Sequence, residues 1–398
     1  MNPPSNIIVS FEVMYKVNHL VQTSKLSGEA LDAEFYARLA EYPDEEAKLM
    51  LETLGKGAGP CWEPLQEMIR SNDPTPKSLQ ASVKLAPGLS WVRRLLVTPT
   101  KVYCMGPEVD TSNRVTRNFA SHADRFMRMS FVDENFEQMN STSLSVPTGG
   151  GGCAWIDAER SPVYHRILAA LKEGFVLGGH KFEFLAFSSS QLREQSVWMF
   201  ASDATLTAAS IRAWMGDFLT IRNVAKCAAR MGQCFSSSTA TLEAPIHEVD
   251  QILDIEREDE FVLSTYCFSD GIGKISREFA REVAKKYEAK TRLLTGIVPS
   301  AFQIRYGGYK GVVAVDPSSR FKLSLRPSMR KFASKHVGLE ILNISRFLPA
   351  YLNRQIIMLL STLGVKDSVF EQMQQRVVSQ LDDILKDADL ARDFLQVP

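Results

Sequence analysis

The stretch PSAFQIRYGGYKGVVAVDP (residues 299–317), with LSLRPSMRKF (residues 323–332) after it, decides the fold of the C-terminal half. Large and polar side chains alternate along Phe302–Tyr306, and more regularly along Lys322–Arg326, where Leu323 and Leu325 share one face. A period of two is typical of half-buried strands. Because Gly-Gly and Pro-Ser turns join these short strands, the sequence predicts a compact barrel.

The same region carries a strong local charge. Ser300 to Lys335 holds eight basic residues and a single acid, Asp316, so its net charge is +7, whereas the whole chain has equal numbers of basic and acidic residues. A field of one sign inside a neutral protein indicates a polyanionic partner. Aromatic rings that such a partner would stack on lie among the basic residues: Phe302, Tyr306, Tyr309 and Phe332.

Two lysines are candidates for phosphate contact. Lys274 and Lys310 each follow a glycine-containing turn, where the backbone can approach a phosphate closely. The alternative is that both are solvated surface lysines. GIGK at residues 271–274 is not a P-loop, because Phe268 replaces the required first glycine and Ile275 replaces the required Ser or Thr.

Two arginines are further candidates. Arg305 and Arg326 fall inside predicted strands, where arginine on a half-buried face usually has an anionic partner. The alternative is a structural salt bridge for each. Asp316 is the only acid nearby in the sequence, and this asymmetry favours a phosphate partner.

The overall pattern predicts an α+β protein of four regions. These are a helical region (1–75), an α/β region (76–260), a strand-rich barrel region (261–345) and a helical segment (346–398). The four glycines of VPTGGGGCAW (146–155) predict a loop, and the acidic stretch 247–260 a solvated connector. Neither a membrane span nor a signal peptide is evident, and the scattered cysteines indicate a reducing intracellular compartment.

Several blocks of sequence point to one family. They are SDGIGKIS (269–276), the stretch 299–317, LNRQIIMLLSTLGV (352–365), RRLLVTPTKVYCMGPEVDTSNRV (93–115), FEFLAFSSSQLREQSVWMFAS (182–202) and RNVAKCAARMGQCFSSST (222–239). With these blocks the chain resembles the eukaryotic cellular RNA-dependent RNA polymerases of RNA silencing, most closely their plant-type branch. The similarity covers nearly the whole chain.

The resemblance implies a core of two double-psi β-barrels with the active site between them, and residues 261–345 would be the first barrel. It implies RNA-directed RNA polymerase activity, in which nucleotidyl transfer to an RNA 3′-hydroxyl makes double-stranded RNA for siRNA-mediated silencing. RNA template, nucleoside triphosphates and silencing machinery such as Dicer-type nucleases would be the partners, in the nucleus or cytoplasm. By motif position, Lys274 and Lys310 would neutralise nucleotide phosphates, and RNA or phosphate contacts would come from Arg305, Lys322, Arg326, Arg330 and Lys331.

The sequence departs from the family in one respect. The catalytic Asp-x-Asp-Gly-Asp loop of the second barrel is absent, and Asp382-Asp383 and Asp387-Ala388-Asp389 lie on a predicted helix without its glycine turn. Mg²⁺, which the complete enzyme would use, needs clustered carboxylates on a rigid turn, so we expect no metal ligands here. The chain is therefore expected to be an internal fragment, a truncated gene model or a short isoform, inactive without the second barrel. The alternative is a non-catalytic RNA- or nucleotide-binding module.

Overall fold

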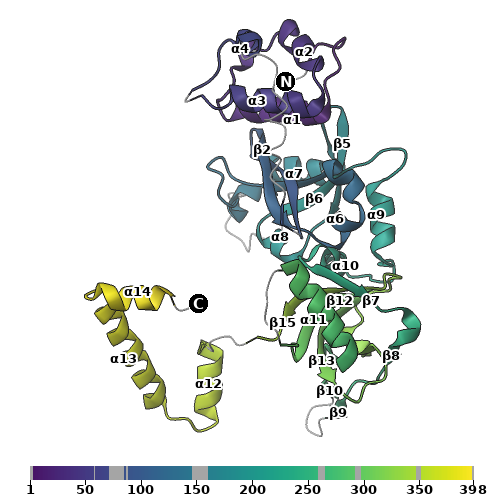
Figure 1. Cartoon of the computed structure of the whole chain (residues 1–398), viewed down its shortest axis with the longest axis vertical. Helices are drawn as coiled ribbons and strands as arrows, with labels where there is room; N and C mark the ends of the chain where they lie inside the picture. The colour runs from purple at the N-terminus through teal and green to yellow at the C-terminus, as the bar shows by residue number, and fades with distance from the viewer. Residues whose placement is uncertain are drawn as a thin grey trace, which may run out of the picture. The chain divides into compact units, whose positions relative to one another are not determined.

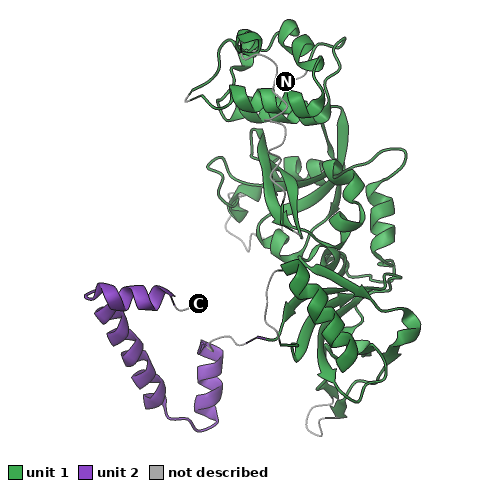
Figure 2. Ribbon diagram, viewed as in Figure 1, with its two compact units in different colours: residues 1–345 green, residues 346–398 purple. Residues whose placement is uncertain are grey.

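The computed structural model describes residues 3–57, 59–70, 85–86, 88–145, 160–258, 265–291, 297–346 and 351–396. The chain divides into two compact units, Met1–Ser345 and Arg346–Pro398 (Figure 2). The glycine loop predicted at residues 146–155 lies outside the described residues, as do the last two residues of the acidic stretch.

The first unit begins with helices. They are α1 (Phe11–Gln22), α2 (Ala33–Ala40), α3 (Asp44–Leu54) and α4 (Pro64–Arg70). Ser10 caps α1 through the backbone N–H of Val13, and the helices bury a core that includes Val17, Phe35 and Leu51. This part of the predicted helical region is therefore helical, and its apolar stripes form the core.

A mixed sheet follows, which we call the N-terminal sheet (Figure 1). Its strand order is β2-β1-β3-β6-β5-β4, with β1 parallel to β3 and the other pairs antiparallel. The bounds are β1 (Leu89–Val97), β2 (Val102–Thr111), β3 (Phe126–Phe131), β4 (Phe175–Leu177), β5 (His180–Ala186) and β6 (Ser196–Ala201). Residues 98–101 join β1 to β2 in an antiparallel hairpin.

Helices cover both faces of the N-terminal sheet, and the central strands β3 and β6 are buried throughout. One face packs on α1 and α7, and the other on α9, α10 and the turn that follows α10. The helices after β2 are α6 (Arg114–Asn118), α7 (Pro162–Lys172), α8 (Ser189–Arg193), α9 (Ala208–Met215) and α10 (Val224–Met231). The hydroxyl of Tyr15 on α1 lies 2.5 Å from the carbonyl oxygens of Arg94 and Met105, which ties the first helix to this sheet.

The second large sheet, which we call the curled sheet, has the strand order β7-β15-β12-β13-β11-β14-β8. Its strands are β7 (Thr239–Glu243), β8 (Val249–Gln251), β11 (Ile272–Ser276), β12 (Ala301–Tyr306), β13 (Tyr309–Asp316), β14 (Leu323–Leu325) and β15 (Gly338–Ile344). The edge strands β7 and β8 are joined by residues 244–248 alone, a connection that reaches at most about 20 Å. The sheet must therefore curl until its two edges approach one another.

The alternation predicted from the sequence sorts side chains between the two faces of the curled sheet. Phe302, Ile304, Leu323 and Leu325 point into a core that also contains apolar side chains of helix α11 (Arg277–Thr291). Arg305, of opposite parity on β12, lies on the outer face. The structure is thus a mixed α+β fold with a curled sheet, which confirms the predicted α+β class.

The acidic stretch 247–260 is more ordered than the predicted solvated connector. Residues 249–251 form β8, which pairs in parallel with β14, and β9 (Glu256–Glu258) pairs with β10 (Thr265–Cys267). The Asp254 carboxylate accepts hydrogen bonds from the hydroxyls of Ser269 and Ser328 and from the Ser328 N–H. Its carboxylates therefore serve partly as local hydrogen-bond acceptors, which composition alone does not indicate.

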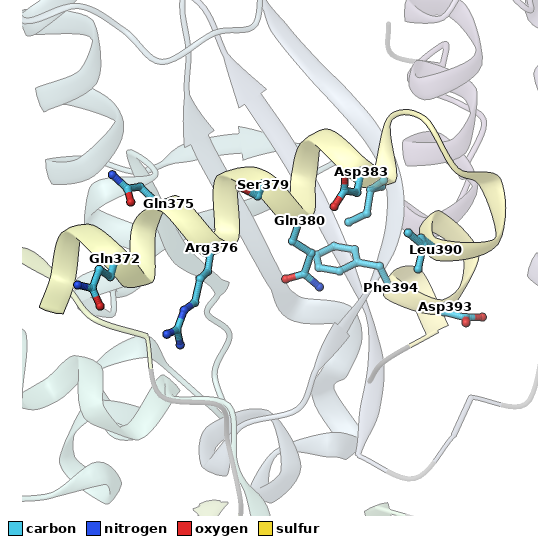
Figure 3. Close-up of a pocket in the computed structure, with 10 residues that line it drawn as sticks. Gln372, Gln375, Arg376, Ser379, Gln380, Asp383, Leu390, Asp393 and Phe394 are labelled. Carbon is cyan, nitrogen blue, oxygen red and sulfur yellow. The ribbon is translucent and has the colours of Figure 1, made fainter.

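The second unit consists of helices α12 (Arg354–Thr362), α13 (Asp367–Ile384) and α14 (Ala388–Gln396), as its periodicity predicts. Helices α13 and α14 line an open cavity of about 750 Å³, toward which Gln380, Leu390 and Phe394 project (Figure 3). The Asp387 carboxylate accepts hydrogen bonds from the backbone N–H groups of Asp389 and Leu390, so it caps α14. No described helix is both long and apolar enough to span a bilayer.

Candidate functional site

The register of the curled sheet places two of the predicted site residues directly opposite one another. Arg305 on β12 faces Lys310 on β13 across the antiparallel pair, and both lie on the outer face. Their Cβ atoms are therefore about 5 Å apart, a separation at which like charges destabilise a sheet. The short turn at Gly307-Gly308 fixes this register.

Arg305 and Lys310 line a cavity of about 580 Å³, which we call the cationic cavity, between the curled sheet, α8 and α10. Arg128, Arg193 and Arg230 also line it. Its two acids, Asp110 and Glu194, both bind Arg128, at 2.9 and 2.7 Å. Within the described ranges, no carboxylate forms an ion pair with the other four cations of this cavity: Arg193, Arg230, Arg305 and Lys310.

Arg305 is only 8% exposed, and its donors are poorly satisfied. One Nη donates to the Ile304 carbonyl oxygen at 3.1 Å, the other lies 3.5 Å from the Ser236 hydroxyl, and Nε has no hydrogen-bond partner. Burial, followed by the charge of Arg114, lowers the pKa of Arg305 to about 10. A buried guanidinium with unused donors is a strong binding element for an oxyanion.

Lys310 lies in the same unfavourable field. Burial lowers its pKa below the usual lysine value, and the nearby charges of Arg305, Arg230 and Lys331 lower it further. Convergent positive charges disfavour the protonated amine, and an anion among them would reverse that effect. The cationic cavity is therefore suited to a ligand with several negative charges.

Lys274 occupies a different place. It pairs with Ala314 across the β11–β13 ladder, four residues along β13 from Lys310, so the two lysines are about 13 Å apart along the strands. Its Nζ donates to the Asp316 carboxylate at 2.7 Å, which lowers the pKa of that carboxyl. Lys274 does not line the cationic cavity. Lys274 is thus a partly exposed lysine held in an ion pair, a contact that neither the phosphate role nor the alternative of a solvated surface lysine predicts.

Lys322 is also paired, with Glu248 at 2.7 Å, and its ammonium lies 5.2 Å from the ring centroid of Phe279. Glu248 lies far from the window 300–335 in sequence. The window charge of +7 therefore overstates the free charge, because chain folding brings in acids from elsewhere.

The remaining predicted residues have no carboxylate partner among the described residues. Arg326 follows β14 instead of lying inside a strand, and its guanidinium donates to the Leu253 carbonyl oxygen. Lys331 donates to the Ser328 carbonyl oxygen, and Arg330 is exposed and forms a β-bridge with Tyr309. Of the seven predicted residues, Arg305 and Lys310 line the cationic cavity, and Lys331 is close enough to Lys310 to affect its charge.

Sequence reasoning missed the residues that other regions contribute. Arg193 on α8 and Arg230 on α10 line the cationic cavity, although each lies inside one of the family-like blocks. The buried cluster behind it was also missed: Glu340, 3% exposed, accepts from Arg114 at 3.1 Å and from Arg117 at 2.7 Å. No charge window reveals these contacts, because the partners lie more than two hundred residues apart.

Two family models cover almost all of the chain. The model described as RNA-dependent RNA polymerase matches residues 97–397. The chain belongs to the RNA-dependent RNA polymerase family. The helical domain of RNA-dependent RNA polymerases matches residues 1–81. The family predicted from the sequence blocks is confirmed.

Relatives in this polymerase family come from plants and fungi. The chain is 50% identical over 392 residues to RNA-dependent RNA polymerase 1 of Arabidopsis thaliana, which covers 97% of this chain and 34% of that protein. RNA-dependent RNA polymerase 2 of the same plant is 44% identical (97% and 34% covered). RNA-dependent RNA polymerase 1 of Schizosaccharomyces pombe is 38% identical (73% and 23%). The chain thus spans about a third of the length of the plant relatives.

A solved structure supports the fold. The RNA-dependent RNA polymerase QDE-1 from Thielavia terrestris superposes with a TM-score of 0.61 at 17% sequence identity, covering 97% of this chain and 42% of that one. At this identity the likeness concerns the fold alone.

RNA-dependent RNA polymerases use Mg²⁺, an ion that clustered carboxylate oxygens bind. Within the described ranges, no three His, Cys, Asp or Glu side chains are grouped to hold a metal. Three carboxylates at or near the site, Asp110, Asp316 and Glu340, already bind arginine or lysine. The described residues therefore do not fit Mg²⁺.

Proposed function

We propose that this chain supplies the phosphate-binding side of the active site of an RNA-directed RNA polymerase of RNA silencing. In this proposal residues 261–345 form the first double-psi β-barrel, residues 1–75 and 76–260 support it, and residues 346–398 follow it. The observation that carries the proposal is the cationic cavity, where Arg305 and Lys310 converge with Arg193 and Arg230 without a carboxylate partner in the described part of the chain.

In the proposed reaction, an RNA 3′-hydroxyl attacks the α-phosphate of a nucleoside triphosphate and pyrophosphate leaves. Lys310 would neutralise charge on the phosphates, and the unused Arg305 donors would fix their orientation. Lys274 would contact phosphate only after exchanging Asp316 for it, which is feasible because this pair is partly exposed and therefore weak. The product would be double-stranded RNA that enters silencing inside the cell through Dicer-type nucleases.

Replacing Lys310 with Met tests the binding role. The variant is expected to bind a fluorescent nucleoside triphosphate about 10- to 100-fold more weakly, because one charge-assisted contact is worth about 1.5–3 kcal/mol. Fluorescence anisotropy on the purified chain measures this. Lys285→Met on α11, an exposed lysine outside the cationic cavity, is the matched control and should bind as the wild type does. Equal affinity in the two variants would contradict the proposal.

The same Lys310→Met variant should be slightly more stable without ligand, by about 0.5 kcal/mol, because it removes one of two like charges opposite each other. Because folding lowers the pKa of Lys310, the protonated lysine destabilises the folded wild-type chain fully at neutral pH. This destabilisation fades as the pH rises through the pKa of Lys310 in the folded chain and then through its higher pKa in the unfolded chain. The difference in Tm between variant and wild type should therefore shrink at alkaline pH. Weaker binding with unchanged or higher Tm separates loss of contact from loss of folding.

With Mg²⁺, a template and all four nucleotides, the purified chain is expected to make no RNA product, because its described residues do not fit the metal. Incorporation of labelled nucleotide on a primed template measures this. Adding a polypeptide that carries the aspartate loop of the second barrel should restore product. Template-dependent product from this chain alone would refute the proposal that this chain binds phosphate and the second barrel binds the metal. If the completed enzyme binds nucleotide and RNA but makes no product, the alternative of a non-catalytic RNA-binding module is favoured.

A further inference from the structure

A third cavity, of about 1030 Å³, lies between α9 and the segment 330–337. We call it the Trp214 cavity. Its lining combines an aromatic and apolar wall, including Trp214 and Leu219, with the basic side chains of Arg330 and Lys335. Leu219 is 96% exposed, so an apolar surface faces solvent beside unpaired charge.

The walls of the Trp214 cavity are fixed by close backbone contacts. Gly216 approaches so closely that a Cβ there would lie 2.7 Å from the Ala333 carbonyl oxygen, and the Asp217 N–H donates to that same oxygen at 2.8 Å. The Trp214 ring meets the His336 ring edge-on at 5.9 Å. The cavity is thus a preformed feature of two pinned segments.

Charge in this cavity is one-sided. Arg330 and Lys335 are exposed, and neither has a carboxylate partner within the described ranges. The acid among the lining residues, Asp217, is engaged, because its carboxylate accepts from the Leu219 N–H at 3.0 Å. The complement of this lining is a ligand with a flat apolar part and regularly placed negative charges.

Adjacent residues line the two cavities, because Arg230 lines the cationic cavity and Met231 lines the Trp214 cavity. Lys331 is near Lys310, while the preceding residue, Arg330, lines the Trp214 cavity. The Lys331 N–H donates to the Gly308 carbonyl oxygen at 2.9 Å, so this segment runs along the start of β13. Basic side chains on adjoining segments of the chain therefore line both cavities.

We propose that the Trp214 cavity binds single-stranded RNA, with a base against Trp214 and Leu219 and neighbouring phosphates on Arg330 and Lys335. Single-stranded nucleic acid carries a stacking face and a charge in every residue, which is the combination this lining complements. The inference rests on the proposed function, because it extends the phosphate-binding site to an RNA strand. An acidic peptide would match the charges and would leave the aromatic wall without a partner.

The test measures binding of two probes to the 398-residue chain: an oligouridine of about 12 nucleotides and a nucleoside triphosphate. The double variant Arg330→Ala, Lys335→Ala should bind the oligouridine on the order of tenfold more weakly, with a shallower salt dependence by about 0.7 per lost phosphate contact. Triphosphate affinity should fall by a smaller factor than oligouridine affinity, because neither residue lines the cationic cavity. The matched control is Lys285→Ala, Lys286→Ala on α11, which removes the same charge elsewhere.

Photo-crosslinking with thiouridine in the oligonucleotide tests the binding site on the wild-type chain. Crosslinked peptides should come from residues 208–219 or 330–337, which line the Trp214 cavity. Unchanged oligouridine affinity and salt slope in the double variant, or crosslinks confined to other segments, would overturn the inference. Competition by an acidic peptide without crosslinking would also overturn it. If Lys310→Met leaves triphosphate binding intact while the double variant loses oligouridine, the proposed function fails and this inference stands.

Discussion

Replacing Glu340 with Ala is expected to lower the free energy of unfolding by about 3–5 kcal/mol, because it leaves buried positive charge uncompensated. The Glu340 carboxylate lies between Arg114, which is 4% exposed, and Arg117, and it stands opposite Arg305 in the β12–β15 ladder. Arg114 also donates to the Gly307 carbonyl oxygen at 2.8 Å. The cluster therefore joins α6 of the N-terminal region to the Gly307-Gly308 turn, which precedes the strand that carries Lys310.

Urea unfolding of the purified chain, followed by tryptophan fluorescence, measures this loss. Glu278→Ala on α11 removes an exposed carboxylate and should change stability by less than about 0.5 kcal/mol. If the urea midpoint of Glu340→Ala equals that of Glu278→Ala within error, Arg114 and Arg117 find other partners and the expectation is wrong. Glu340→Gln should lie between the two, because it keeps the shape of the side chain and an acceptor oxygen.

The second large effect is expected from Gly308→Ala. A Cβ at Gly308 would lie 1.8 Å from the carbonyl oxygen of Phe332, a backbone atom that cannot move aside alone. Phe332 is itself held, because its ring packs on Phe218 with centroids 4.7 Å apart. The substitution must therefore displace either the β12–β13 turn or the segment after Met329, and we expect a loss of about 3 kcal/mol.

Thermal unfolding measures the loss for Gly308→Ala, and Gly59→Ala is the control, because a Cβ at Gly59 meets nothing within 4 Å. A Tm for Gly308→Ala equal to that of the control would mean that the segment slides without cost. Displacement of this segment should also weaken oligouridine binding, because Arg330 and Lys331 move with it.

The local part of this architecture could be predicted from sequence. The alternation at Lys322–Arg326 placed Leu323 and Leu325 on one face, and the structure shows that this face lies in the core. The blocks around Lys274 and Lys310 identified the family. Each of these signals extends over only a few consecutive residues, which is enough to specify a strand or a tight turn.

The charge balance of the site was not predictable in the same way. Lys322 finds Glu248, and the arginines of α6 find Glu340, across separations that only the folded chain closes. The acidic stretch 247–260 is predicted as a solvated connector for a related reason. Strand β8 within it is too short to show an alternating pattern, and it forms by pairing with β14, which lies more than seventy residues later in the sequence. The roles of all seven candidate cations stay predictions, although the structure shows that two of them are paired and two face one cavity.

The short link between β7 and β8 has a consequence for how the chain is made. These strands are translated first, yet their neighbours in the sheet are β15 and β14, which emerge from the ribosome up to about a hundred residues later. At about 5–20 residues per second, residues 239–251 wait roughly 5–20 s for their partners. During that interval these two segments lack the strands with which they pair in the folded sheet, and both have their partners only once Ile344 has been synthesised.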